Sequence, residues 1–182
     1  MNLLFVQGKG GVGKSTLAFL FAITIQKSGK TVGIRDLDPQ KSLTAWLKDT
    51  KGFTLATEGE VTIIDTPPRI DDRRVLAAIR AADRIVIPTT PSPADVATVH
   101  HSAAIVQENR QPSSRAFVVY NRVKKASTYG KNLEDLSANL PIPPAQTVIH
   151  ERELFKHVLM DGWPALDATA KEEIMNLVIE VQ

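Results

Sequence analysis

The residues with the clearest chemical potential form a glycine-rich loop near the start of the chain. Residues 8–16 read GKGGVGKST, which matches the pattern G-x-x-x-x-G-K-[ST] and lies between an apolar run and a helical pattern. Glycines let backbone N–H groups converge on phosphate oxygens, and the dipole of the following helix favours the same negative charge. The loop therefore predicts a nucleotide site built from Gly8, Lys9, Gly10, Gly11, Val12, Gly13, Lys14, Ser15 and Thr16.

Three side chains of this loop differ in the chemistry that we expect of them. Lys14 is expected to hold the β and γ phosphates. Ser15 is expected to place its hydroxyl on Mg²⁺, because this hard ion takes few protein oxygens beside phosphate and keeps several waters. Lys9 adds a second cation to a loop that already neutralises phosphate, which has little value for packing. We interpret Lys9 as functional; the alternative is a solvent-exposed lysine.

Three aspartates lie at or just past the ends of apolar, strand-like runs. They are Asp36, Asp38 and Asp65. Ligands of open α/β sheets bind beyond the carboxyl ends of the strands, so these carboxylates are expected to cluster beside the glycine-rich loop. Residues 61–68 read VTIIDTPP, which predicts that Asp65 ends a strand and holds a Mg²⁺-bound water. The alternatives are a turn residue for Asp36 and an N-cap of the following helix for Asp38.

The rest of the chain shows strand-like and helical patterns in alternation. We expect strands at residues 3–7, 31–36, 61–65, 84–88 and 115–120, with a weaker one at 147–149. We expect helices at residues 15–27, 72–82, 94–109, 132–140 and 168–181, with a short one at 152–160. Short, continuously apolar strands are typical of sheets covered on both faces. The sequence therefore predicts an α/β fold, a mostly parallel twisted sheet flanked by helices on both faces, as one domain over residues 1–182.

Composition excludes several classes of site. The chain has no cysteine, so disulfides, cysteine-ligated zinc, iron-sulfur clusters and thiol nucleophiles are ruled out. The apolar stretch near the first residue spans only about four residues and lacks a basic flank, unlike a signal peptide. No uninterrupted apolar run approaches the roughly 18 to 20 residues that a membrane span requires. We expect a cytoplasmic protein.

The motifs together resemble those of the ParA/MinD family of P-loop NTPases, which carry a deviant Walker A motif. KGGVGKST, DLDPQKSLTAW, IIDTPP and IVIPTTPSPADV occur in the order found in small ParA-type partition ATPases. The resemblance implies an ATP-sandwich homodimer in which Lys9 reaches the partner's nucleotide. It further implies that Asp38 positions the attacking water and that Asp36 supports Mg²⁺ indirectly. Asn121 with Arg122, which follow a strand, would face adenine; the alternative is a turn-forming asparagine.

The same resemblance implies partners. ATP-bound ParA dimers bind DNA without sequence preference and associate with the nucleoid. Such binding depends on phosphate neutralisation, for which a few cations suffice even though the net charge is only +2. The cations that we nominate are Lys124, Lys125, Arg152 and Lys156. A ParB-like or other cargo-bound activator would stimulate a slow ATPase; the residues do not identify the cargo.

Other functions are compatible with the same loop. A membrane-positioning switch of the MinD type would end in a basic amphipathic helix, whereas this chain ends with Glu172, Glu173 and Glu180, which disfavours anionic lipid. A metabolic ligase would need a small-molecule pocket, for which the sequence shows no residue set. A non-hydrolysing scaffold would not require both Asp38 and Asp65.

Overall fold

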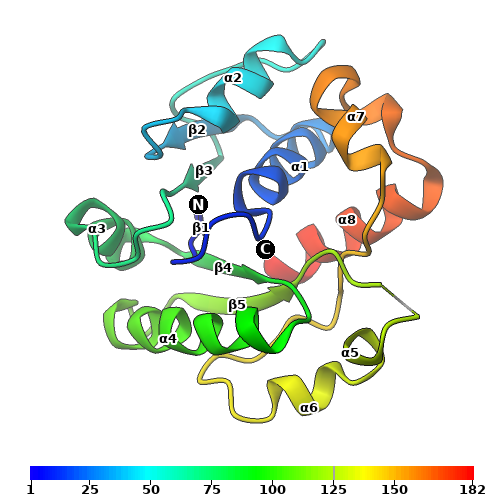
Figure 1. Ribbon diagram of the computed structural model, residues 1–182. Helices are drawn as coiled ribbons and strands as arrows, with labels where there is room; N and C mark the ends of the chain where they lie inside the picture. The colour runs from blue at the N-terminus through cyan, green and yellow to red at the C-terminus, as the bar shows by residue number, and fades with distance from the viewer. Residues whose placement is uncertain (125) are drawn as a thin grey trace.

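A parallel sheet forms the centre of the computed structural model, which describes residues 1–124 and 126–182 (Figure 1). The strands are β1 (Asn2–Phe5), β2 (Val32–Asp36), β3 (Val61–Asp65), β4 (Arg84–Thr89) and β5 (Arg115–Tyr120). Their order across the sheet is β2-β3-β1-β4-β5, and each neighbouring pair is parallel. The carboxyl ends of all these strands therefore meet at one edge of the sheet, with β1 in the middle.

Helices cover both faces of this sheet. They are α1 (Lys14–Lys27), α2 (Ser42–Asp49), α3 (Arg73–Ala81), α4 (Pro93–Asn109), α5 (Thr128–Lys131), α6 (Leu133–Ser137), α7 (Leu154–Asp161) and α8 (Ala168–Val181), with a 3₁₀ turn η1 (Trp163–Ala165). Side chains of α1, α2, α7 and α8 share one apolar cluster with the sheet. Side chains of α3, α4 and α6 belong to the cluster on the other face. This arrangement confirms the predicted α/β fold.

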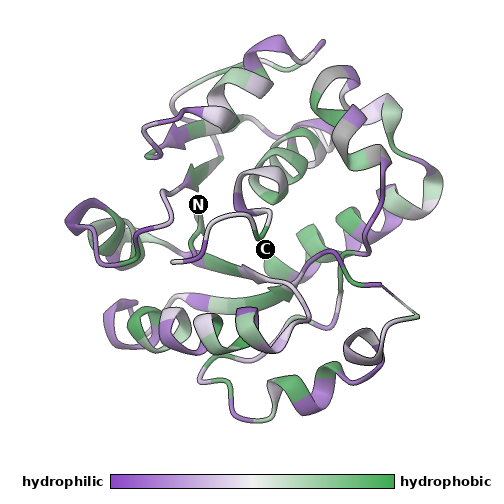
Figure 2. Ribbon diagram, in the orientation of Figure 1, coloured by the Kyte–Doolittle hydropathy of each residue, from purple (hydrophilic) through white to green (hydrophobic). Residues whose placement is uncertain are grey.

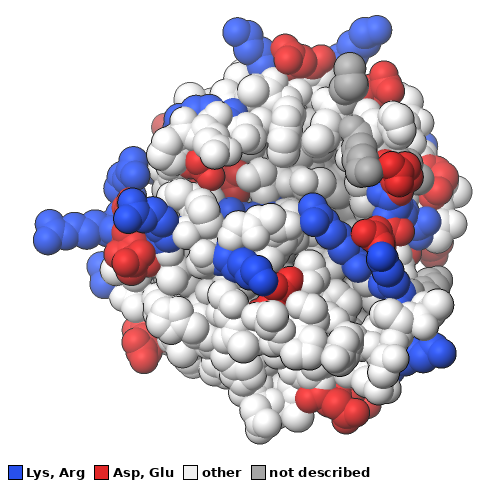
Figure 3. Space-filling model, viewed as in Figure 1, with Lys and Arg blue, Asp and Glu red and all other residues white. Residues whose placement is uncertain are grey.

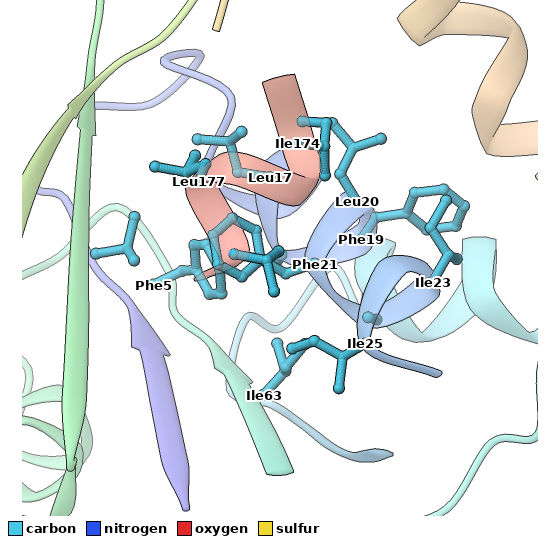
Figure 4. Close-up of a cluster of buried hydrophobic side chains, with 14 of the residues drawn as sticks. Phe5, Leu17, Phe19, Leu20, Phe21, Ile23, Ile25, Ile63, Ile174 and Leu177 are labelled. Atoms are coloured by element: carbon cyan, nitrogen blue, oxygen red, sulfur yellow. The ribbon is translucent and has the colours of Figure 1, made fainter. Parts of the chain in front are cut away.

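Helix α1 is buried on all sides between the sheet and α8 (Figure 4). The ring of Phe21 on α1 meets that of Phe5 on β1 edge to face, with centroids 5.1 Å apart. On another side of α1, Phe19 packs edge to face against Trp46 of α2. Figure 2 shows the strands and α1 as the most hydrophobic parts of the fold. A helix that is apolar all round is stable only when buried, so α1 holds the glycine-rich loop on a rigid support.

Two predicted elements differ from the structure. The weak strand at residues 147–149 is wrong: this segment follows the edge of β5 through single bridges only, Val118 with Pro144 and Val123 with His150. Prolines at positions 141, 143 and 144 remove the N–H donors that a continuous ladder needs. The predicted helix at 132–140 is shorter than expected, since α6 ends at Ser137, and α5 begins earlier, at Thr128.

Candidate functional site

The glycine-rich loop joins the central strand β1 to the start of α1 (Figure 1). Gly13 occupies the N-cap of α1 with φ 93°, and Gly11 has φ 81°, a backbone conformation that L side chains rarely adopt. Among the described residues, no side chain caps this end of α1. The first N–H groups of the helix are therefore available to an anion, as the sequence predicts for phosphate.

An open cavity of about 380 Å³ lies over this loop. Its lining comes from four separate segments and comprises Gly10, Gly11, Gly13, Lys14, Ser15, Thr16, Asp38, Gln40, Trp46, Pro68 and Arg122. The fold thus brings Asp38 beside the loop, as expected from its position after a strand. Gln40, Trp46 and Pro68 also line the cavity. They belong to the motifs DLDPQKSLTAW and IIDTPP, but the sequence analysis had given them no role of their own.

Asp65 lies fully buried at the end of β3, in register with Asp36 on β2 and Phe5 on β1. Its Oδ1 accepts a hydrogen bond from the Thr66 N–H at 3.0 Å, while Oδ2 is buried with no hydrogen-bond partner among the described residues. Burial raises the pKa of Asp65 to about 6, although the Ser15 hydroxyl and the Lys14 ammonium nearby act to lower it.

This unpaired oxygen is the observation that fits a metal ion. A buried carboxylate oxygen without a partner is costly. A hard cation such as Mg²⁺ takes oxygen ligands of this kind, beside hydroxyl and phosphate oxygens. Ser15 and Asp65 together therefore suit a Mg²⁺ ion at the phosphate site.

Asp36 makes hydrogen bonds within the turn that follows β2 and with the start of α2, and its indirect support of Mg²⁺ stays a prediction. Its Oδ2 accepts hydrogen bonds from the N–H and hydroxyl of Thr44, at 3.1 and 3.2 Å, and its Oδ1 accepts one from the N–H of Asp38 at 3.1 Å. The Lys41 ammonium donates to the Asp36 carbonyl, and Lys41 itself has φ 53°. Asp36 therefore fixes the turn that presents Asp38 and anchors the start of α2.

Asp38 lies within this turn and lines the cavity. Its Oδ1 accepts a hydrogen bond from the Gln40 N–H at 2.9 Å. The N-cap of α2 is Lys41, so the alternative interpretation of Asp38 as that N-cap is wrong. Its carboxylate is held two residues from its anchor, Asp36, at the edge of the phosphate cavity.

Asn121 braces the glycine-rich loop from behind. Its Nδ2 donates to the Val12 carbonyl at 2.9 Å, and its Oδ1 accepts from the Arg122 N–H at 3.0 Å. A Cβ at Gly13 would overlap the Asn121 amide nitrogen. These two bonds use one N–H and one lone pair of the amide, so one donor and one acceptor site remain. Asn121 also lines a further cavity, and its contact with adenine stays a prediction.

A second cavity, of about 390 Å³, adjoins the first and shares Thr16 and Arg122 with it. Its remaining lining consists of Leu20, Asn121, Glu151, Arg152, Glu153, Phe155 and Leu159. Arg122 has φ 55°, an uncommon conformation for a residue with a side chain. This residue stands at the boundary between the two cavities.

Lys9 does not belong to the lining of the phosphate cavity. Its ammonium contacts Asp95 Oδ1 in the first turn of α4, and its side chain is 40% exposed. The loop is joined to α4 at a second point, because the Gly8 N–H donates to Ser102 Oγ at 3.2 Å. The sequence had marked Lys9 as functional without indicating either contact.

The nominated DNA-contact residues have mixed environments. Arg152 donates to Glu173 Oε1 at 2.6 Å and its side chain is only 18% exposed. Lys124 pairs with Glu151 at 3.1 Å and is well exposed. Lys125, and the side chain of Lys156, lie outside the described residues. Arg152 thus joins the chain before α7 to α8, and its contact with DNA stays a prediction.

Comparison with known proteins adds sequence and structural relatives. Residues 3–163 match the model of the CobQ/CobB/MinD/ParA nucleotide binding domain. Maintenance of carboxysome distribution protein A of Gloeobacter kilaueensis is 34% identical over 118 residues, which cover 53% of this chain and 54% of that protein. The match thus covers about half of the length of this relative.

Two solved structures share the fold. A plasmid partition protein of Borrelia burgdorferi bound to AMPPNP gives a TM-score of 0.77 at 18% identity, with 99% of this chain and 97% of that chain covered. MinD of Aquifex aeolicus gives a TM-score of 0.80 at 18% identity, with 98% and 95% covered. Together with the match over residues 3–163, the phosphate loop and its cavity show that the chain belongs to the CobQ/CobB/MinD/ParA nucleotide-binding family.

Proposed function

We propose that this protein is a Mg²⁺-ATP-dependent switch ATPase that dimerises with ATP, binds DNA without sequence preference and positions a cargo such as a plasmid or a protein assembly. One observation carries the nucleotide part of this proposal: a single cavity gathers the phosphate loop and Asp38, beside the unpaired Asp65 oxygen. Relatives named for carboxysome distribution and plasmid partition support the positioning part.

The residues divide the chemistry among them. Lys14 and the N–H groups of the loop bind the phosphates, while Ser15 and Asp65 hold Mg²⁺, which supplies charge neutralisation for phosphoryl transfer. Asp38 orients the attacking water from the turn that Asp36 fixes. Lys9 acts on the nucleotide of the partner protomer. Positioning and charge stabilisation of this kind account for most of the catalysis of phosphoryl transfer.

The second cavity suits the base and sugar of the nucleotide. Leu20 and Phe155 give it an apolar wall, and it meets the phosphate cavity at Thr16 and Arg122. Nucleotide sites combine such apolar surfaces with a few polar groups that fix orientation. We assign the base to this cavity, with Arg122 at the junction between base and phosphates.

Size measurement with ADP, with ATP and with ATP plus DNA tests the switch. We expect a monomer with ADP, a dimer with ATP and a DNA-bound dimer with both. Lys14→Ala should lose ATP binding and dimerisation. Asp38→Ala should dimerise with ATP but hydrolyse it far more slowly. Normal turnover in either variant would contradict the assigned site.

DNA binding requires its own test. Figure 3 shows the Lys and Arg side chains on this face as separate groups interleaved with acidic ones, rather than one continuous basic field. Among the nominated cations, Lys124 is exposed beside the second cavity's Glu151. Lys124→Ala should weaken retention on random duplex DNA with ATP. The slope of log affinity against log salt concentration should become shallower by about 1, the value expected for the loss of one phosphate contact. Lys51→Ala, at an exposed lysine of another segment, is the matched control.

A MinD-type membrane switch remains the second candidate. None of the described helices is long and apolar enough to cross a bilayer. Helix α8 exposes Met175 and Ile179, an observation that favours an apolar partner. The same helix also carries Glu173 and Glu180, which accept hydrogen bonds from the segment that follows the edge of β5. Flotation with anionic liposomes and ATP distinguishes the two candidates: retention on DNA without flotation supports the DNA-binding switch.

A further inference from the structure

We propose that Asp95 is a positioning residue that holds Lys9 within its own protomer and thereby limits how readily Lys9 reaches a second protomer. This inference rests on the proposed function, in which Lys9 acts on the partner's nucleotide. Lys9 carries one ammonium, which contacts Asp95 Oδ1 in this structure. In this proposal, contact with Asp95 competes with contact with the phosphates of a second protomer for the same ammonium.

The carboxylate of Asp95 is held in place by contacts other than the one with Lys9. Its side chain is only 12% exposed, and its Oδ2 accepts a hydrogen bond from the Thr90 hydroxyl. Its backbone N–H donates to Ser92 Oγ, the N-cap of α4, at 3.2 Å. A negative charge in the first turn of a helix is favoured by the helix dipole. Asp95 therefore presents a preorganised anion rather than a mobile surface acid.

Helix α4 also holds the backbone next to Lys9. Ser102, two turns further along α4, accepts from the Gly8 N–H and donates to the Gln7 side chain. The start of the loop is thus joined to α4 at two points, whereas Gly13, Lys14 and Ser15 face the cavity. Because these contacts involve Gln7, Gly8 and Lys9 and none of the three residues that face the cavity, release of Lys9 does not require the phosphate-binding part of the loop to move.

The strength of the ion pair suits a restraint that can be released. Lys9 is 40% exposed, so water and salt screen the pair in part. Pairs of this exposure change an equilibrium by about two- to five-fold. Such a restraint shifts the equilibrium between monomer and dimer towards the monomer without preventing an ATP-bound dimer.

A first experiment needs no nucleotide. Reductive methylation followed by peptide mass spectrometry measures how accessible the Lys9 Nζ is in the nucleotide-free protein. In Asp95→Asn, which keeps hydrogen-bonding groups for Thr90 and Ser92, Lys9 should react several-fold faster than in wild type. Lys51 should react equally in both proteins. Equal Lys9 reactivity in the two proteins would overturn the proposal.

A second experiment measures dimerisation against protein concentration at saturating ATP. Asp95→Asn should dimerise at about two- to five-fold lower concentration than wild type. Asp95→Glu, which restores the charge, should return towards wild type, and Asp71→Asn at an exposed acid before α3 should have no effect. Faster labelling of Lys9 with unchanged dimerisation would show that the Lys9–Asp95 ion pair does not limit dimerisation, and would overturn the proposal. Failure of wild type to dimerise with ATP would instead reject the proposed function.

Discussion

The Asn121 side chain and the Val12 carbonyl are joined by a hydrogen bond of 2.9 Å, across 109 positions of sequence. This bond ties the end of β5 to the loop at the end of β1. Both groups are buried, so neither can turn to water if the other is removed. The geometry of the phosphate loop therefore depends on a residue that lies outside the loop motif.

Asn121→Ala should destabilise the fold by about 1 to 3 kcal/mol, because the Val12 carbonyl would be buried without its partner. ATP affinity should fall with it, since the loop loses its brace. Denaturant unfolding and nucleotide titration measure the two effects. Asn132→Ala, at an exposed asparagine between α5 and α6, should change stability by less than about 0.5 kcal/mol. Equal effects of the two substitutions would contradict the brace.

Gly13→Ala should abolish ATP binding for two separable reasons. Its φ of 93° is unfavourable for alanine, and the added Cβ would overlap the Asn121 amide nitrogen. Gly29→Ala isolates the first reason, because Gly29 has φ 91° with open space around it and should cost about 1 to 2 kcal/mol. Gly13→Ala should cost clearly more in thermal unfolding. Similar costs at the two sites would show that the overlap is relieved without strain.

Asp65→Asn should stabilise the nucleotide-free protein while it abolishes Mg²⁺-dependent turnover. Burial raises the Asp65 pKa from 3.8 to about 6, so the folded state disfavours the charged form at neutral pH, by about 3 kcal/mol. The stability of wild type should accordingly fall as pH rises from about 4 to 6 through this group, and the asparagine variant should lack that decline. Unfolding without Mg²⁺ at pH 5 and pH 8 measures it; a variant less stable than wild type at pH 8 would refute the expectation.

Glu173 should make the folded protein more stable as pH rises, which is the opposite of the effect of Asp65, and it should do so at lower pH. Burial raises the pKa of this carboxyl, but hydrogen bonds from Arg152 and His150 outweigh it, and the net pKa lies below the usual 4.5. The stability that Glu173 contributes is therefore present above pH 4.5 and is lost as pH falls through its folded pKa. Melting curves below pH 5 should fall more steeply in wild type than in Glu173→Gln. Its exposed neighbour provides the control, since Glu172→Gln should leave the acid limb unchanged.

Local chemistry explains why the phosphate loop could be predicted. The positive φ angles at Gly11 and Gly13 depend on the absence of a side chain, which the sequence states directly. The carboxylates at strand ends follow from the parallel order of the sheet, so the position of Asp38 was predictable in the same way. The helical pattern at residues 15–27 predicted α1. It could not show that α8, from the far end of the chain, packs against this helix.

Long-range pairing explains what the sequence did not show. Lys9 and Asp95 are 86 positions apart, and Gly8 and Ser102 are 94 apart, so no local pattern links them. The sequence also did not show that Asp36 accepts two hydrogen bonds from Thr44, one from its N–H and one from its hydroxyl. Each of these outcomes was decided by which groups the fold places within hydrogen-bonding reach.

The segment that replaced the expected sixth strand also shields the sheet from uncontrolled association. Residues 143–151 run along β5, and the N–H of Ile149 bonds to the Tyr120 carbonyl at 2.9 Å. At the opposite edge, the Ile34 N–H of β2 bonds to the Ala56 carbonyl at 2.8 Å. Both outer strands thus have their exposed backbone groups partly occupied, which discourages a second chain from extending the sheet. Under the proposed function, in which the protein joins and leaves a copy of itself through the face around the phosphate loop, this coverage would obstruct the alternative route of strand addition.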